Sequence, residues 1–286
     1  MNGRPEASAD AQLPDSYPET HPRAHRPETP RQRERARSGT GTVVFLHGGN
    51  VANWMWESQV RALPDFQVLT PNLPGFGTRS EEQWVSLEAT ADDVAGFIAE
   101  HAEAGPVHLV GLSLGAVVAL QVAARHPDLA SSLLVSGAVV SRVGGLPRAL
   151  SALQLAFWER EWFWRAQARA FRLPADSVEL YVRHGLSVQR GNAQRMLAQV
   201  YAGSLPEGLG RYGGRVLAVA GQKEPGVVAK SFGLLRGKLS NARFRLAPGM
   251  HHVWNVEDES LFNAMVRQWL SGSVHPDLVI PAGRPA

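Results

Sequence analysis

The residues best suited to covalent chemistry surround Ser113, in the run Gly111-Leu112-Ser113-Leu114-Gly115. This run follows the apolar segment 107–110 and precedes an apolar helical pattern, so it is expected to form the turn between a buried strand and a helix. Such a sharp turn strains the serine backbone and needs glycine on both sides, so that neighbouring backbone can pass. The hydroxyl would then project alone beside a helix N-terminus, as a nucleophile for acyl transfer requires. The alternative is a glycine-rich turn whose serine only caps the helix.

A serine nucleophile requires a base to accept its proton, and this base is most often a histidine. The histidines downstream of the serine are His126, His184, His251, His252 and His275. Of these, the adjacent pair at 251 and 252 lies in the loop directly after the last apolar run that predicts a strand. A metal site is not expected at this pair, because adjacent loop side chains diverge and no acidic or cysteine ligand stands at metal-binding spacing. The pair therefore marks the expected position of a general base.

Short apolar runs bounded by glycine, proline or asparagine predict the strands that would position these groups. The predicted strands are Val43 to Leu46, Phe66 to Leu69, Val107 to Val110, Leu133 to Val135, Val216 to Ala220 and Phe244 to Leu246. The predicted helices of this part of the chain are Leu87 to His101, Gly115 to Arg125 and Leu261 to Leu270. Because strands and helices alternate, we expect an α/β fold with a mostly parallel sheet covered by helices.

The chain divides into segments of different composition. Residues 1–40 are rich in proline and charged residues and poor in aliphatic ones, so we expect a disordered tail that cannot offset its chain entropy. Residues 41–140 and 206–272 would form the core, and residues 273–286 a C-terminal tail. Residues 141–205 contain no strand-like run but include the aromatic helical stretch AFWEREWFWRAQARAF. We expect this segment to be an inserted helical lid.

Composition excludes several classes of function. The chain has 286 residues and no cysteine, so disulfides, thiolate metal sites and cysteine nucleophiles are excluded. The net charge of +3 is small and the arginines are scattered, which gives no support for nucleic-acid binding. Neither a leader pattern at the start nor a later apolar stretch of membrane-spanning length is found, so we expect a soluble cytoplasmic protein without membrane association. The expected partner is a small-molecule substrate, and the oligomeric state stays open.

The motifs and their order resemble those of the α/β-hydrolase family, over nearly all of the span from Thr42 to Leu270. After the first predicted strand, His47-Gly48-Gly49-Asn50 resembles the HG turn of that family. Residues 71–80, PNLPGFGTRS, are similar to its D-x-P-G-x-G-x-S loop, although Asn72 replaces the aspartate and one extra residue precedes the serine. We expect Asn72 to make the turn hydrogen bonds that the carboxylate would make. The resemblance implies an α/β-hydrolase fold with a helical lid.

The resemblance also implies an oxyanion hole and a base. The backbone amides of Gly49 and Leu114 would bind the oxyanion, with Asn50 as the near alternative to Gly49. Two such oriented donors can lower a reaction barrier by several kcal/mol. Pro248-Gly249-Met250-His251-His252 is similar to the G-x-G-H loop of the family, and this alignment makes His252 the base. His251 would then occupy the place of the second glycine and pack beside it.

The acid of the site would follow the strand Val216 to Ala220. The turn Gly221-Gln222-Lys223-Glu224-Pro225 is similar to the G-x-x-D turn of the family, so the resemblance assigns Glu224 to the acid position. The chain order is then Ser, Glu, His, as this fold requires. Alternatives are that Glu224 forms a surface ion pair with Lys223, and that Glu257 or Asp258 is the acid. No cofactor and no metal is implied.

These assignments predict a serine hydrolase that cleaves a small, largely apolar ester or related acyl compound through a Ser-His-Glu triad. A serine nucleophile argues against the haloalkane dehalogenases and epoxide hydrolases of this family, which use aspartate at that position. A C–C bond hydrolase or lyase of the same fold is the first alternative, and extra charged residues in the lid would be its usual sign. A small-ligand receptor without turnover is the second.

The aromatic part of the lid has two interpretations. We expect Trp158 and Trp162 to bind apolar parts of the substrate. In the alternative, the tryptophans pack the lid onto the core and the neighbouring charges face water. Those charges are Glu159, Arg160, Glu161 and Arg165.

Overall fold

A mostly parallel sheet organises the chain, and the apolar runs of the sequence form its strands. The computed structural model describes residues 18–21, 41–145, 153–203 and 205–281. The sheet has the order β1-β3-β2-β4-β5-β6-β7, in which β1 is antiparallel to β3 and the other neighbours are parallel. The strands are β1 (Thr20–His21), β2 (Thr42–Leu46), β3 (Gln67–Leu69), β4 (Val107–Leu112), β5 (Ser132–Ser136), β6 (Arg215–Gly221) and β7 (Ala242–Ala247). The predicted α/β fold is therefore confirmed.

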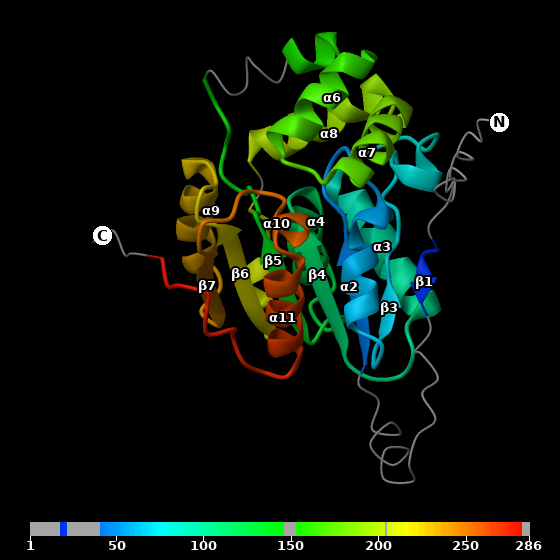
Figure 1. The fold of residues 1–286 in the computed structure, drawn as a ribbon. Helices are drawn as coiled ribbons and strands as arrows, with labels where there is room; N and C mark the ends of the chain where they lie inside the picture. The colour runs from blue at the N-terminus through cyan, green and yellow to red at the C-terminus, as the bar shows by residue number, and fades with distance from the viewer. Residues whose placement is uncertain (1–17, 22–40, 146–152, 204, 282–286) are drawn as a thin grey trace, which may run out of the picture.

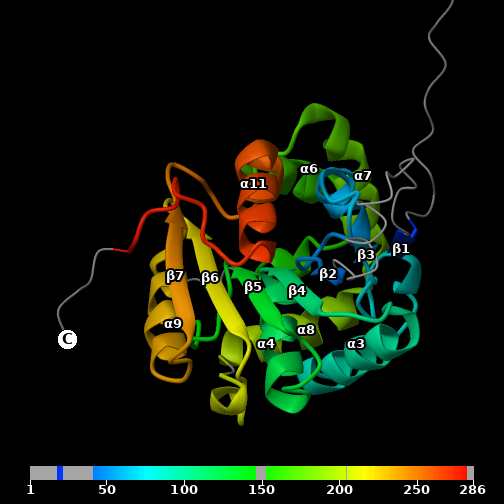
Figure 2. The same ribbon diagram turned by 90° about the horizontal axis from the view of Figure 1, so that it is seen from below.

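Helices cover both faces of the sheet, with α3, α4 and α9 on one face and α2 and α11 on the other (Figure 2). The helices of this core are α2 (Glu57–Ala62), α3 (Leu87–His101), α4 (Leu114–Arg125), α9 (Gly226–Arg236), α10 (Trp254–Glu257) and α11 (Glu259–Leu270). Single 3₁₀ turns lie at η1 (Asn53–Trp56), η2 (Gly77–Arg79) and η3 (Leu209–Arg211). Every residue of β4 is buried, because both faces of its sheet are covered. Among the described residues, no helix is long and apolar enough to cross a membrane.

Within the described residues, the longer helices between β5 and β6 form a group beyond one end of the sheet (Figure 1). They are α6 (Glu161–Ala170), α7 (Ala175–Ser187) and α8 (Arg190–Ala202). We call residues 153–203 the helical insertion. Its own core is aromatic: Trp158 and Trp164 are almost fully buried, and the Trp164 indole donates to the Trp158 carbonyl at 2.7 Å. These helices fall within residues 141–205, whose role as a lid stays a prediction. Residues 146–152 and 204 of that segment lie outside the described residues.

Helix α8 is bonded to the core through the loop between residues 82 and 87. The Asn192 side chain accepts from the backbone amide of Trp84 at 2.9 Å and donates to the carbonyl of Glu82 at 2.7 Å. The Gln199 side chain makes a similar pair of bonds, with the amide of Leu87 and the carbonyl of Val85. Because these side chains satisfy backbone groups of an irregular loop, they fix α8 against the core.

One segment of the predicted disordered tail has a defined place. Thr20 and His21 pair with Leu69 and Val68 as the edge strand β1. The Glu19 carboxylate accepts from the backbone and side-chain amides of Asn72, at 3.2 and 3.1 Å. The prediction of disorder is therefore wrong for residues 18–21. Backbone pairing with β3 and hydrogen bonds to Asn72 hold this segment, although it buries little apolar surface. The rest of the segment 1–40 lies outside the described residues.

Candidate active site

Ser113 stands at the turn between β4 and α4 with a strained backbone. Its φ of 56° and ψ of −112° are unusual for a residue with a side chain, and its amide donates to the Ser136 carbonyl at 2.8 Å. A side chain at Gly115 could not be accommodated, since a Cβ there would lie 2.0 Å from the Leu46 carbonyl oxygen. At Gly111 it would lie 2.4 Å from the carbonyl oxygen of Gly115. The flanking glycines therefore allow the close approach that the sequence analysis required of this turn.

Two backbone amides flank the serine. Gly49 and Leu114 line the same cavity as Ser113, Gly49 in the turn after β2 and Leu114 as the first residue of α4. Within the described residues, no backbone hydrogen bond occupies either amide. Asn50, the alternative to Gly49, also lines the cavity and has a φ of 65°. Two backbone amides that face one cavity are suited to bind a developing negative charge, and the amide of Leu114 also lies at the N-terminus of α4.

His47 holds the turn that carries Gly49. The Leu73 amide donates to its Nε2 at 3.0 Å, so the proton lies on Nδ1, which donates to the Gly48 carbonyl at 2.8 Å. Burial lowers the pKa of His47 to about 4, although its bond to Gly48 acts in the opposite direction. The ring is therefore neutral at pH 7. The His47 ring thus joins the turn after β2 to the loop that contains Asn72 and Leu73. The Asn72 side chain accepts from the Asn53 amide and donates to the Thr78 hydroxyl, which are the turn hydrogen bonds expected of it.

His252 is paired with a buried carboxylate. Its Nδ1 lies 2.6 Å from Oε2 of Glu224, whose side chain is only 2% exposed. The other oxygen of Glu224 accepts from the Gly221 amide at 2.8 Å, which orients the carboxylate. An Nδ1–H that donates to Glu224 leaves Nε2 as the basic atom of the ring. The structure thus places Glu224 against His252, and the alternative of a surface ion pair with Lys223 is wrong.

The neighbouring histidine has a different glutamate. Both the backbone amide and Nδ1 of His251 lie 2.8 Å from the carboxylate oxygens of Glu257. Burial raises the pKa of Glu257, but these hydrogen bonds outweigh it and the pKa lies below its usual range. Asp258 accepts from the Leu261 amide as the N-cap of α11. Both alternative acids are therefore engaged away from His252.

Sequence reasoning missed two residues that support His252. Gly137 follows β5 with a φ of 63°, and a Cβ there would lie 2.8 Å from Cε1 of His252 and 3.1 Å from Oε2 of Glu224. Only glycine therefore lets the histidine and the glutamate meet beside β5. The Trp254 indole donates to the Ser136 hydroxyl at 3.0 Å and holds the loop after His252. A glycine directly after a buried strand indicates that another part of the chain packs closely against it, but the sequence does not identify that part.

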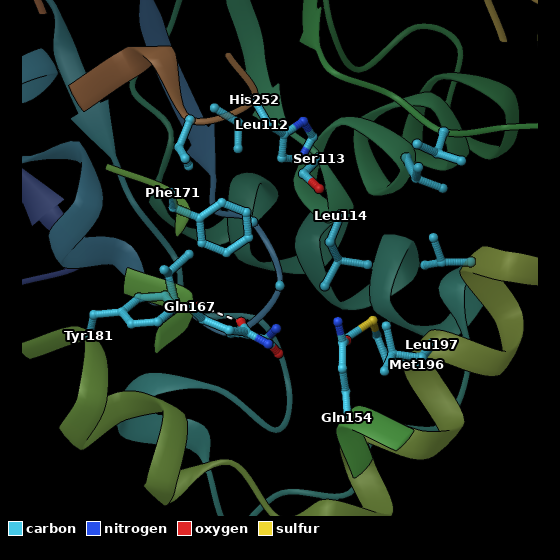
Figure 3. Close-up of a pocket in the computed structure, with 18 of the residues that line it drawn as sticks. Leu112, Ser113, Leu114, Gln154, Gln167, Phe171, Tyr181, Met196, Leu197 and His252 are labelled. Carbon is cyan, nitrogen blue, oxygen red and sulfur yellow. Dashed lines mark hydrogen bonds between the residues drawn. The ribbon is translucent and has the colours of Figure 1, made fainter. Parts of the chain in front are cut away.

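Ser113, His252 and the residues of the two amides line one cavity of about 460 Å³ between the core and the helical insertion. Figure 3 shows Ser113 and His252 next to each other on its wall. Most of the other lining side chains are apolar, and among them are Leu112, Leu114, Phe171, Met196 and Leu197. Within the described residues, no lysine, arginine, aspartate or glutamate lines this cavity. A volume and lining of this kind are typical of small-molecule sites.

The structure does not bring the predicted tryptophans to this cavity. Trp158 is 1% exposed and donates its indole hydrogen to the Val188 carbonyl at 2.8 Å, inside the insertion. Trp162 is 57% exposed and contacts only its aromatic neighbours Phe157 and Phe163 among ring pairs in the described residues. The prediction that these two tryptophans bind substrate is therefore wrong for this cavity, because packing within the insertion decides which face of α6 points inward. Phe171, just after α6, lines it instead.

Charged residues of the insertion face away from the cavity. Arg165 makes ion pairs with Glu161 at 2.7 Å and with Glu179 at 2.6 Å, on an exposed surface between α6 and α7. This arrangement agrees with the packing interpretation, in which the charges face water. In the described part of the chain, no group of three or more histidine, aspartate and glutamate side chains is placed to hold a metal ion.

Comparison with known proteins gives matches over most of the chain. The model of a family described as "Alpha/beta hydrolase family" matches residues 43–264. An AB hydrolase superfamily protein of Gibberella zeae is 24% identical over 258 residues, which are 84% of this chain and 83% of that protein. A pimeloyl-[acyl-carrier protein] methyl ester esterase of Neisseria meningitidis is 37% identical over 109 residues, which are 37% of this chain and 41% of the esterase.

Solved structures of two esterases have the same fold. A thermophilic esterase from Thermogutta terrifontis superposes with a TM-score of 0.65 and 23% identity, over 80% of this chain and 89% of the esterase. An esterase from Exiguobacterium antarcticum gives a TM-score of 0.70 and 17% identity, over 81% of this chain and 92% of the other. At this level of identity the likeness establishes the fold.

Proposed function

Because the chain belongs to the alpha/beta hydrolase family, we propose that it is a serine hydrolase that cleaves a small, largely apolar carboxylic ester. The observation that carries this proposal is the meeting of Ser113 and the His252–Glu224 pair at one apolar cavity. Its relatives include pimeloyl-[acyl-carrier protein] methyl ester esterases and a lipase, which supports an ester as the bond cleaved.

In the proposed mechanism, Ser113 attacks the ester carbonyl while Nε2 of His252 accepts the serine proton. The amides of Gly49 and Leu114 donate to the oxyanion that develops on the carbonyl oxygen. Glu224 accepts from Nδ1 of His252, so it fixes the tautomer and stabilises the imidazolium without itself taking the proton. The imidazolium then protonates the leaving alcohol. Water, activated by the same histidine, hydrolyses the acyl-enzyme and releases the acid.

The lining of the cavity supports an uncharged acyl group. A charged substrate group buried among these side chains would lose its water without gaining an ionic partner, which is costly. The C–C hydrolase alternative is less favoured, because the charges of the insertion that would support it face water. The receptor alternative is less favoured, because binding without turnover does not require an oriented histidine and glutamate beside a strained serine.

The test is hydrolysis of p-nitrophenyl acetate and octanoate by the wild type and by Ser113→Ala. We expect kcat/KM of the variant to fall by about a thousandfold or more, because nucleophile and base act as one unit. The variant should keep the circular dichroism and melting temperature of a folded protein. Retention of more than about a tenth of the activity would remove Ser113 from the mechanism.

A further inference from the structure

Two glutamines of the helical insertion face the cavity from the side opposite Ser113. Figure 3 shows the side chains of Gln154 and Gln167 pointing into it, on the far side of the cavity from the serine. Gln154 precedes α6, and Gln167 lies within α6. Apolar side chains such as Leu114 and Phe171 form the walls between the two ends. The cavity therefore has a reactive end in the core and an amide-bearing end in the insertion.

A buried tyrosine orients one of these amides. The Tyr181 hydroxyl donates to Oε1 of Gln167 at 2.9 Å, and Tyr181 is only 2% exposed. Since Oε1 is engaged, the Nε2 hydrogens of Gln167 are left to face the cavity as donors. Within the described residues, no hydrogen bond occupies this nitrogen or the side chain of Gln154. Burial also raises the pKa of Tyr181, so its hydroxyl remains a protonated donor at any physiological pH.

We propose that Gln154 and Gln167 bind a neutral hydrogen-bond acceptor, such as a ketone oxygen, on the acyl chain of the substrate. This inference rests on the proposed function and narrows its substrate class from apolar esters to esters of oxo acids. A saturated chain that reaches this end would displace water from the amides and leave their donors unpaired. A carboxylate could accept hydrogen bonds from the same amides, but no cation in the cavity would offset the free-energy cost of burying its charge. An uncharged carbonyl oxygen can accept from the amide nitrogens without that penalty.

The experiment compares octanoate with the 4-, 5-, 6- and 7-oxo-octanoates, as p-nitrophenyl esters for turnover and as methyl esters for binding. Wild-type kcat/KM should favour the best oxo ester over octanoate by about fivefold or more, the net effect expected of one neutral hydrogen bond. Binding of the methyl esters to Ser113→Ala, measured by calorimetry, should show the same preference in Kd without turnover.

Gln167→Glu is the decisive variant, because it keeps an acceptor for Tyr181 but removes the Nε2 donor. We expect Gln167→Glu to lose the preference for the oxo ester in both measurements. Gln154→Leu should reduce this preference. The matched control is Gln189→Leu, because Gln189 is an exposed glutamine of the same insertion that bonds Glu81 and does not line the cavity. This control should keep the wild-type preference.

The two levels of the proposal fail separately. If wild-type protein hydrolyses no ester, p-nitrophenyl acetate included, the proposed function is wrong, and the Kd values of Ser113→Ala still decide the role of the amides. Equal Kd values for octanoate and every oxo-octanoate would overturn the inference, even in an active esterase. Retention of the oxo preference by Gln167→Glu would overturn it as well.

Discussion

The two walls of the cavity differ in what they contribute. The core wall carries Ser113, His252 and the two free amides, each held by a turn at the end of a strand. The insertion wall, from Gln154 to Tyr201, carries apolar side chains, amides and tyrosine rings but no charge within the described residues. Under the proposed function, the core would determine whether a bond is cleaved, and the insertion would determine which substrates are held. Substitutions in the two walls should therefore have effects of different kinds and sizes.

The largest effect should separate two adjacent histidines of the core. His252→Ala removes the proposed base and should lower kcat/KM for every ester by about a thousandfold. His251→Ala breaks only the contact with Glu257 and should lower kcat/KM by less than about fivefold, since its ring does not line the cavity. The measurement is hydrolysis of p-nitrophenyl acetate by both variants. Equal losses would show that both rings take part in the reaction, and the reverse ranking would make His251 the base.

A smaller loss is expected at the acid of the core. Glu224→Gln should lower kcat for p-nitrophenyl acetate by about a hundredfold, because it no longer stabilises the imidazolium but removes neither nucleophile nor base. The matched control is Glu257→Gln, which alters the carboxylate paired with His251. We expect Glu257→Gln to retain most of the activity. A near wild-type rate for Glu224→Gln would mean that the His252–Glu224 contact is structural only.

The smallest effect, and one restricted to long substrates, is expected in the insertion. Phe171→Ala should raise KM for p-nitrophenyl octanoate by about tenfold, equivalent to about 1.4 kcal/mol of lost apolar contact. The acetate ester, too short to reach the ring, should show almost no change. Trp162→Ala is the control, because this tryptophan of the same insertion is 57% exposed and does not line the cavity. Equal shifts in the two variants would contradict the division between the walls.

The core wall could be predicted from the sequence because its constraints are local. Each reactive group stands within a few residues of a glycine turn after a strand, so the spacing predicts the position of Ser113 and favours the loop of His252. Helix α3 likewise begins and ends at its predicted residues, because Ser86 caps it and accepts from the Ala89 amide. Helix α9 was missed because Gly226 and Gly233 interrupt its helical pattern.

The insertion could not be predicted to the same depth because its constraints are tertiary. The sequence indicates helices rich in tryptophan, but it does not say which face of α6 packs inward. That choice depends on contacts with other helices, such as the ring contact of Trp164 in α6 with Tyr181 in α7. The approach of His252 and Glu224 to Gly137 could not be predicted either, because these residues are far apart in the sequence. Edge strand β1 is held in part by the hydrogen bond between Glu19 and Asn72, and no periodic pattern in the sequence predicts such a contact.

The central claim, that the core wall holds an activated serine, is tested most directly by covalent labelling. A fluorophosphonate ester should modify the wild-type protein with loss of its leaving group, and peptide mass spectrometry should place the adduct on Ser113. His252→Ala should label at least about a hundredfold more slowly, because the hydroxyl has lost its base. Ser113→Ala should not label, and Trp162→Ala should label at the wild-type rate. An adduct on another serine, or no adduct on folded wild-type protein, would contradict the claim.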